Sequence, residues 1–300
     1  MSDRRSKSPI QVEQVRWQPV VCAFCGSSET KFFNHEGWPW QTEYVRCVQC
    51  GLIFLQPRPT LDPVVLQHLY ENAAPLVNEY ANPHQISVES IEPKHWRRYA
   101  DSLANIVAAH PVPGVLVDVG TGNGLLMVLA QRQCWQSIGI EVSDSRARVC
   151  RENFGLDVRT GTLESVHLPA ESADAMAMRH VLEHVEDPVR LMLEAQRVLR
   201  PGGILLLEVP NPVGVELAFR RGLQRLKLRR PKWPGNVVPW HLFEFPPVCL
   251  AKKAVELGFR VVRRCSYSHG NLHNPVALLA LRAYHHFGIG TKTRLVLRKQ

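Results

Sequence analysis

The sequence lacks the long apolar segments that membrane-spanning proteins need. No apolar run in the 300-residue chain approaches the length of about 18 residues that a bilayer-crossing helix requires. The first eight residues are basic, and no apolar segment follows them, so we expect no secretory signal and a disordered tail over residues 1–17. These absences predict a cytoplasmic protein.

Cysteines and acidic residues are also limited in number. Eight cysteines are too few for a disulfide scaffold in a chain of this length, which favours free thiols in a reducing compartment. Lys and Arg number 36 against 27 Asp and Glu, for a formal net charge of +9. This balance favours acidic or phosphorylated partners, or an anionic membrane surface, without choosing among them. The 45% of apolar residues is enough to bury a sizeable core.

Half of the cysteines lie in two C-x-x-C-G motifs, at residues 22–26 and 47–51, with 21 residues between the pairs. Four thiolates in two such pairs make a tetrahedral structural zinc site. Two disulfides or a redox dithiol are the alternatives, and the reducing compartment and the second pair argue against them. We predict a zinc-binding module over residues 18–60. Its ligands would be Cys22, Cys25, Cys47 and Cys50, which leave no open position for catalysis.

The residues around these motifs also carry patterns. The segment between the pairs, with Trp38, Trp40 and Tyr44, favours a small β-hairpin. Apolar residues at helical spacing, interrupted by prolines, predict a helical linker over residues 61–110. Its last part, Lys94–Ala109, is amphipathic, and we expect it to pack against a larger sheet beyond the linker.

The strongest pattern lies at residues 115–130. Five mostly β-branched residues, Val115–Val119, predict a buried parallel strand; three glycines then predict a tight loop, and an apolar run predicts a helix to at least Gln133. Such a loop is where α/β sheets bind ligands, because glycines let backbone N–H groups approach an anionic group. Glu141 ends the next apolar run, which predicts a carboxylate beside the loop that can accept ribose hydroxyls.

The glycine spacing separates two classes of nucleotide site. A dinucleotide site requires G-x-G-x-x-G, and Gly120 and Gly122 fit it. The third glycine comes one residue early, at Gly124, and position 125 is Leu. An acid about 20 residues further on fits either class, and a tight turn without a ligand is the remaining alternative.

Strand and helix patterns alternate through the rest of the chain. Predicted helices lie at residues 143–150 and 187–199, and predicted strands at residues 157–159, 175–178 and 204–209. This alternation predicts an α/β fold with a doubly wound parallel sheet. Residues 274–286 favour a further helix, and residues 293–298 a final strand.

Residues 115–124, 180–188 and 198–203 together resemble class I S-adenosylmethionine-dependent methyltransferases, in order as well as in spacing. The paired cysteines and residues 51–59 are similar to the zinc-ribbon subgroup of that family, which occurs beside sugar and cell-surface polysaccharide pathways, among others. The resemblance covers about residues 20–265. It implies a Rossmann-like, seven-stranded sheet with one antiparallel edge strand, in a methyltransferase domain over residues 111–300.

The resemblance also implies, position by position, which residues hold S-adenosylmethionine. The methionine end would lie against Asp118, Gly120, Gly122 and Gly124. Glu141 would bind the ribose hydroxyls, and Val142 would lie against the adenine, which Thr162 and Leu163 would border. Many members carry an acid where Thr162 stands. Arg179 and His180 follow the fourth strand, where the family brings cofactor and acceptor together.

Transfer of a methyl group to a hydroxyl needs a base as well as in-line positioning. The candidates are His180, Glu183, His184 and His241. His180 and His241 are favoured, and the alternative for His180 is a residue that only shapes the pocket. Glu183 and His184 are expected to orient their own turn. Residues 180–184 also spell H-x-x-E-H, a zinc-protease signature, but they follow a short strand and precede a helix start at Asp187.

A basic segment over residues 217–232 holds seven Arg or Lys residues and no acid. It favours a lid that grips an anionic acceptor or rests on the inner membrane surface; a solvated face and RNA binding are the alternatives. The sequence therefore predicts a methyltransferase for a hydroxyl of a sugar or lipid-linked glycan. An RNA methyltransferase is less favoured because no Asn/Asp-Pro-Pro-Tyr motif is present. A catalytically inactive cofactor-binding module is the other alternative, and the oligomeric state stays open.

Overall fold

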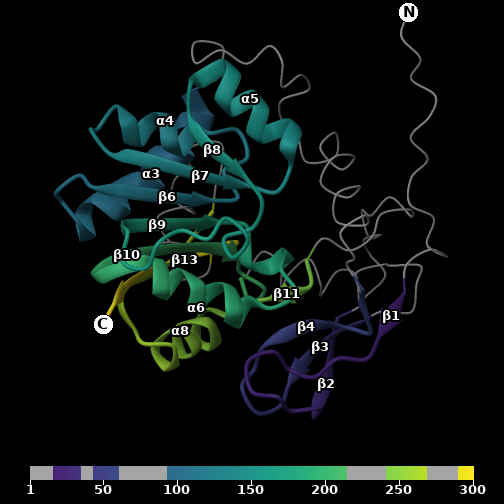
Figure 1. The fold of residues 1–300 in the computed structure, drawn as a ribbon. Coiled ribbons are helices and arrows are strands. Elements are labelled where there is room, and N and C mark those ends of the chain that lie inside the picture. The colour runs from purple at the N-terminus through teal and green to yellow at the C-terminus, as the bar shows by residue number, and fades with distance from the viewer. Residues whose placement is uncertain (1–15, 35–42, 61–92, 215–240, 269–289) are drawn as a thin grey trace, which may run out of the picture.

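The computed structural model describes residues 16–34, 43–60, 93–214, 241–268 and 290–300. These residues form a large sheet flanked by helices and a smaller sheet that carries the paired cysteines, the two lying side by side (Figure 1). No helix among the described residues is long and apolar enough to cross a membrane.

The large sheet has seven strands in the order β12-β13-β10-β9-β6-β7-β8. The strands are β6 (Val115–Val119), β7 (Gln136–Glu141), β8 (Asp157–Thr160), β9 (Ala173–Arg179), β10 (Leu199–Pro210), β12 (Phe259–Tyr267) and β13 (Lys292–Lys299). The pairs from β10 across β9 and β6 to β8 are parallel, whereas β13 runs antiparallel to both neighbours. The predicted α/β fold with a seven-stranded sheet is confirmed.

The antiparallel strand is not at the edge, where the resemblance placed it. β13 lies between β10 and β12, and β12 forms the edge. The residue patterns explain this order. Leu295 and Leu297 of β13 are fully buried, as is common for an interior strand, whereas the middle of β12 is exposed, as an edge strand tolerates.

Helices cover both faces of the sheet, because alternate strand residues point to opposite sides. Leu116 packs with α3 (Pro93–Ala109) and α4 (Leu125–Gln131), whereas Val117 belongs to the core beneath α6 (Pro188–Val198) and α8 (Pro247–Glu256). Leu103 and Ile106 of α3 are fully buried in the first of these cores. The predicted packing of this helix is confirmed, so the last part of the predicted linker over residues 61–110 packs on the large sheet.

The helix ends follow from local capping. Ser143 caps α5 (Asp144–Phe154) by accepting the Arg146 N–H, and Asp187 caps α6 in the same way. α4 ends at Gln131, earlier than the predicted Gln133, because the Trp135 N–H turns back to the carbonyl of Ala130 and the buried Trp135 leads into β7.

The smaller sheet has the order β11-β4-β3-β2, with β2 (Thr30–Asn34), β3 (Glu43–Cys47), β4 (Ile53–Gln56) and β11 (Phe243–Glu244). The predicted hairpin is the antiparallel pair β2–β3; Trp38 and Trp40 lie outside the described residues. β1 (Trp17–Gln18) pairs with β5 (Arg58–Pro59), so Trp17 belongs to a strand and not to the predicted tail. We call described residues 16–60 the cysteine module.

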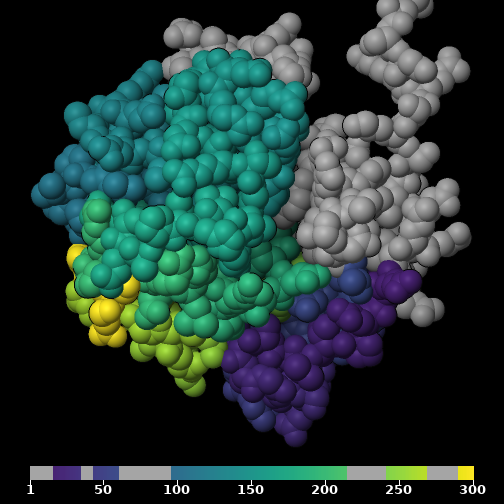
Figure 2. Space-filling view, in the orientation of Figure 1, coloured from purple at the N-terminus to yellow at the C-terminus, as the bar shows by residue number. Residues whose placement is uncertain are grey.

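The cysteine module shares both a sheet and a core with the larger domain. β11, which follows the large domain's residue Leu242, pairs antiparallel with β4 of the module. One hydrophobic core contains Phe24 and Phe54 of the module together with Phe245 and Leu250. In the space-filling view the module lies directly against the part of the surface formed by α8 and its neighbours (Figure 2). Residues on both sides of the predicted boundary at residue 60 therefore contribute to one core and one sheet.

Candidate active site

The glycine loop sits at the carboxyl end of β6, against the segment that follows β9. Gly120, Gly122 and Gly124 all have positive φ angles, of 71°, 60° and 74°, a conformation that glycine adopts without strain. A Cβ on Gly120 would lie 2.5 Å from Cγ2 of Val181, and one on Gly124 would lie 2.6 Å from Cδ1 of Leu156. The loop is thus closely packed beside His180 and Val181.

The backbone N–H groups of the three glycines and of Thr121 are hydrogen-bonded within the protein. Those of Gly120 and Thr121 donate to the carbonyl of Ile140, at 2.8 and 3.1 Å, and that of Gly124 donates to the carbonyl of Thr121. The Gly122 N–H donates to Glu141 Oε2 at 2.8 Å. The expected cradle of backbone donors for an anion is therefore wrong for these glycines, because the loop folds back on the end of β7.

Two buried carboxylates lie beside the loop, so the site favours positively charged groups and hydrogen-bond donors. Glu141 is 4% exposed, and its oxygens accept N–H groups from Gly122 and Ser143. Asp118 is 3% exposed. Burial, with the neighbouring carboxylates of Glu141 and Glu208, raises the pKa of Asp118 to about 7 against the lowering effect of Arg179. Such a pair suits a cationic group and hydroxyls, as the ammonium and ribose of S-adenosylmethionine provide.

The positions assigned to the adenine differ in their surroundings. Val142 is 40% exposed directly after Glu141, so it offers an apolar surface. Thr162 is exposed, and its N–H and hydroxyl bond to Ser165. Leu163 is fully buried in the core, so its side chain forms part of the wall behind the site. The cofactor contacts of all three residues stay predictions.

Arg179 belongs to a buried ionic network that the sequence reasoning missed. Its Nε donates to Glu208 Oε2 at 2.9 Å, and its guanidinium lies 4.1 Å from the ring centroid of Tyr99. Glu208 also accepts from Ser102 and Arg294. Burial opposes its charge, but Arg179 and Arg294 hold the pKa of Glu208 below its usual range. The sequence offered one indication of this network, because Glu208 is the single acid within the apolar strand Ile204–Val209. The cofactor contact assigned to Arg179 stays a prediction.

His180 and Glu183 form a hydrogen-bonded pair at the end of β9. His180 has a φ of 56°, an uncommon backbone conformation for a residue with a side chain. Its Nδ1 lies 3.1 Å from Oε1 of Glu183, whose side chain is fully buried. Burial favours the neutral acid, but the hydrogen bond from His180 and the charges of His184, His180 and His241 bring the pKa of Glu183 down to about 2.

The charge of Glu183 decides the tautomer of His180. An ionised carboxylate can only accept, so Nδ1 of His180 carries the proton, and in the neutral ring Nε2 presents a lone pair. Nε2 is buried and has no hydrogen-bond partner in the part of the chain that the structure describes. The pair therefore has the arrangement of a general base, with a carboxylate that orients the imidazole.

His241, the second predicted base, lies close to this pair. Its ring is 4.9 Å from that of His184 in an edge-on arrangement, and its Nδ1 is 3.5 Å from Glu244 Oε1. Its backbone carbonyl accepts a hydrogen bond of 2.7 Å from the hydroxyl of Tyr44, which lies in β3. Sequence reasoning counted Tyr44 only as part of a hairpin, since nothing in the sequence links it to a residue 197 positions away.

Glu183 and His184 lie in a short 3-10 helix, η4 (Leu182–His184), and not on a long helix. Leu242 connects this helix to the module, because its N–H donates to the carbonyl of Glu183 and its own carbonyl accepts the Leu55 N–H. The zinc-protease arrangement, which needs both histidines on one long helix, is therefore absent at residues 180–184.

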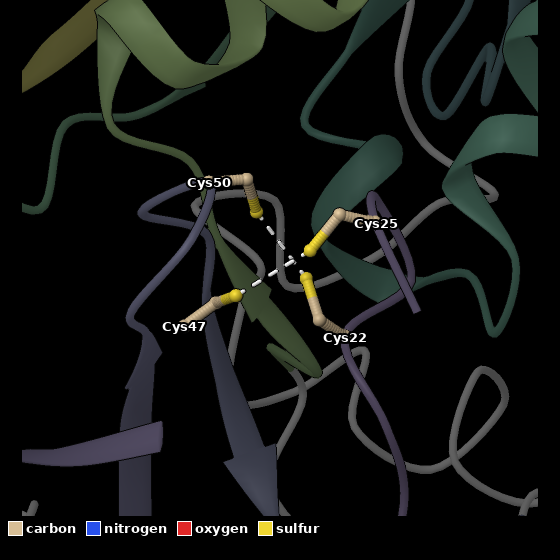
Figure 3. A group of neighbouring side chains, drawn as sticks. All are labelled: Cys22, Cys25, Cys47 and Cys50. Atoms are coloured by element: carbon tan, nitrogen blue, oxygen red, sulfur yellow. Dashed lines mark hydrogen bonds between the residues drawn. The ribbon is translucent and has the colours of Figure 1, made fainter. Parts of the chain in front are cut away.

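The four predicted metal ligands converge as expected. The sulfur atoms of Cys22, Cys25, Cys47 and Cys50 lie within 4.8 Å of one another and point toward a common centre (Figure 3). The closest Sγ pairs are Cys22–Cys50 at 3.3 Å and Cys25–Cys47 at 3.5 Å, and none of the four thiols forms a disulfide. The donor set and its spacing fit one tetrahedral metal ion. Cys249 of α8 lies beside Cys50, which the sequence did not indicate.

The predicted basic lid over residues 217–232 and the helix at residues 274–286 lie outside the described residues. The proposed contacts of the lid with an anionic acceptor, a membrane surface or RNA therefore stay predictions. The predicted final strand is present as β13.

Comparison with known proteins places this site in a family. Residues 117–207 match a family model described as a methyltransferase domain. A probable S-adenosylmethionine-dependent methyltransferase of Mycolicibacterium smegmatis is 27% identical over 180 residues, which cover 60% of this chain and 65% of that protein. A ubiquinone biosynthesis O-methyltransferase of Cereibacter sphaeroides is 27% identical over 174 residues, covering 52% of this chain and 67% of that protein.

The chain contains a class I S-adenosylmethionine-dependent methyltransferase domain. A solved structure described as a possible histamine N-methyltransferase of Thermotoga maritima supports the fold of this domain. It is 20% identical, has a TM-score of 0.51, and aligns over 78% of this chain and 99% of that one. The chain spans about two thirds or less of the curated relatives named above, so the similarity identifies the methyltransferase domain and not the acceptor.

Proposed function

We propose that the protein transfers the methyl group of S-adenosylmethionine to an oxygen atom of its acceptor, with His180 as the base. The observation that carries the proposal is the His180–Glu183 pair, with Nε2 of His180 buried and without a partner among the described residues. The relatives named as O-methyltransferases support an oxygen acceptor. A hydroxyl is the acceptor that needs such a base, because its oxygen is a poor nucleophile while protonated.

S-adenosylmethionine supplies an electrophilic methyl group on a positively charged sulfur. Asp118 would hold its ammonium group, and Glu141 its ribose hydroxyls, through lone pairs that the backbone N–H groups leave available. Tight packing of the loop against Val181 keeps this cofactor site adjacent to His180. His180 would accept the acceptor's proton at Nε2, while Glu183 keeps the ring oriented and stabilises its positive charge.

The acceptor we propose is a hydroxyl of a sugar or of a lipid-linked glycan. This choice rests on the resemblance to the zinc-ribbon subgroup and on the oxygen-directed base. Contact with an anionic headgroup or membrane surface would come from the basic residues 217–232.

The four-cysteine group is proposed to hold a structural zinc ion. Four thiols on two tight turns are the donor set that zinc prefers, and all four positions of a tetrahedron are filled by protein. The role is structural because no position is left for a substrate.

The proposal is tested by turnover of S-adenosylmethionine with a panel of nucleotide sugars, lipid-linked sugars, small amines and RNA. His180→Gln should lower hydroxyl methylation by about 100- to 10,000-fold, the scale of a positioned base, and leave cofactor affinity unchanged. His167→Gln is the matched control, because His167 is exposed and lies in the segment between β8 and β9, whereas the pair follows β9. Unchanged turnover in His180→Gln, or turnover only with amines or RNA, would contradict the proposal.

A further inference from the structure

A second group of metal-ligating side chains lies outside the four-cysteine group. Glu183, His184 and His241, which we call the histidine cluster, place one ligand atom each within 4.8 Å of one another. The three residues come from two segments, η4 and the residue two before β11, which the Leu242–Glu183 backbone hydrogen bond holds together. Two imidazoles and a carboxylate are a ligand set that divalent transition metals favour.

One buried oxygen atom of the histidine cluster has no hydrogen-bond partner among the described residues. Glu183 is fully buried and its Oε1 is bonded to His180, but its Oε2 is buried with no hydrogen-bond partner among the described residues. A buried carboxylate oxygen without a hydrogen-bond partner is unfavourable, because nothing compensates for the loss of its hydration. A cation bound between this oxygen and the two imidazoles would remove that cost.

The surroundings of the cluster also resemble those of metal-bound histidines. Nδ1 of His241 is 3.5 Å from Glu244 Oε1, so Glu244 can help to fix the orientation of the ring. Carboxylates commonly orient metal-binding imidazoles in this way. The Tyr44 hydroxyl fixes the backbone of the same residue. His241 is thus held from both its ring and its main chain.

We propose that Glu183, His184 and His241 bind a divalent transition-metal ion at the acceptor side of the methyltransferase domain. Three protein ligands leave the ion a free position, which is typical of catalytic rather than structural metal sites. The site differs in kind from the four-cysteine group, whose ion is fully enclosed by thiolates.

The role of this ion rests on the proposed function. The acceptor's hydroxyl oxygen would bind at the free position, where the ion would lower the pKa of the hydroxyl. The O–H proton would pass to Nε2 of His180. The oxygen would then form a bond to the methyl carbon as the carbon–sulfur bond breaks and its electron pair returns to sulfur. The products are a methyl ether, S-adenosylhomocysteine and a proton, so atoms and charge balance.

Binding of Mn²⁺ to the full-length chain tests the site directly. Mn²⁺ prefers oxygen and nitrogen ligands over thiolates, so the four-cysteine group keeps its zinc during the titration. Free Mn²⁺ is followed by electron paramagnetic resonance, and zinc content by elemental analysis. Equilibrium dialysis with Zn²⁺ is run in parallel. We expect one saturable ion per chain in addition to the zinc of the four-cysteine group.

The substitutions His241→Gln and His184→Gln should each lower the affinity for this second ion by about tenfold or more, at least the loss seen when a residue that orients a metal ligand is removed. His167→Gln should bind like the wild type. Glu183→Gln should have the largest effect, and if it fails to fold the two histidine variants still decide the question. Thermal unfolding and S-adenosylmethionine affinity verify that each variant is folded.

Absence of a second saturable ion, with both Mn²⁺ and Zn²⁺, would overturn the proposal. Unchanged affinity in both histidine variants would do the same. Because binding is measured without turnover, the two ideas fail separately. A second ion without hydroxyl methylation contradicts the proposed function alone, and hydroxyl methylation without a second ion contradicts the metal site alone.

Discussion

The two halves of the candidate site are built in different ways. The methionine and ribose positions of the cofactor half come from one continuous stretch, residues 118–143, whose loop, carboxylates and strand end bond mainly to one another. The acceptor half is assembled from residues 180–184, residues 241–244 and Tyr44 of the cysteine module. The first half is closed by local contacts and the second by contacts over long distances in the sequence.

This difference has a consequence for how the halves respond to damage. The loop and carboxylates of the cofactor half are hydrogen-bonded within β6, β7 and their connection, whereas the acceptor half depends on the pairing of β11 with β4 and the shared core around Phe54 and Phe245. Loss of the cysteine module should therefore impair acceptor turnover more than cofactor binding.

The largest effect is expected for Cys22→Ser. Cys22 is a candidate zinc ligand and is buried in the shared core, and structural zinc binding contributes on the order of 10–16 kcal/mol to small zinc domains. We expect loss of zinc, a lower melting temperature and loss of acceptor turnover, with a smaller loss of S-adenosylmethionine affinity. Elemental analysis, calorimetry and turnover assays measure these quantities.

Cys134→Ser is the matched control, because this thiol is exposed and lies outside the four-cysteine group. Full zinc content in Cys22→Ser would contradict the assignment of the ligands. Equal losses of turnover and cofactor affinity would show that the two halves are not independent.

Glu141→Ala should act on the opposite half. It removes the acceptor of two backbone N–H groups and the predicted partner of the ribose hydroxyls. S-adenosylmethionine affinity should fall by about 1.5–3 kcal/mol, the scale of a hydrogen bond to a charged group. Titration calorimetry measures it, with the exposed Glu152→Ala as control. An affinity equal to that of the wild type, or tight NAD binding, would refute the assignment.

Asp118 should make cofactor binding depend on pH. Its pKa of about 7 leaves it largely neutral at pH 5.5. A bound ammonium group favours the ionised form, so its pKa falls in the complex and a proton is released on binding. Affinity should therefore rise by up to about tenfold per pH unit from pH 5.5 to 7, where the cofactor's amine stays cationic. Asp118→Asn should flatten this profile; a wild-type profile that is already flat would contradict the role.

Tyr44→Phe should have the smallest effect and tests the long-range half alone. It removes only the hydroxyl that donates to the carbonyl of His241. A neutral hydrogen bond contributes about 0.5–1.5 kcal/mol, so turnover should fall by up to about tenfold. Zinc content and S-adenosylmethionine affinity should not change, because the ring remains packed. A change in cofactor affinity instead of turnover would show that Tyr44 does not act through His241.

Local patterns predicted most of the elements correctly. The alternation of strands and helices, the glycine loop and the helix starts near Ser143 and Asp187 depend on a few neighbouring residues and were found as predicted. The helix predicted over residues 143–150 continues to Phe154, where Gly155 ends it. The end of α4 was missed because the helix is ended by Trp135, which lies beyond it in the sequence. The side chain of Trp135 is buried, and its N–H donates to the carbonyl of Ala130. The place of β13 was missed because strand order is a relation between distant segments.

The sequence by itself determined the fold class, the group of four cysteines and the position of the glycine loop. Each of these follows from the spacing of residues along the chain: periodic apolar residues, two C-x-x-C pairs, and glycines at the end of a strand. Only the tertiary structure decided which donors face inward in the loop, that Arg179 pairs with Glu208, and that Tyr44 and β4 support His241. The physical reason is that burial and pairing between segments far apart in the chain leave no periodic trace in either segment.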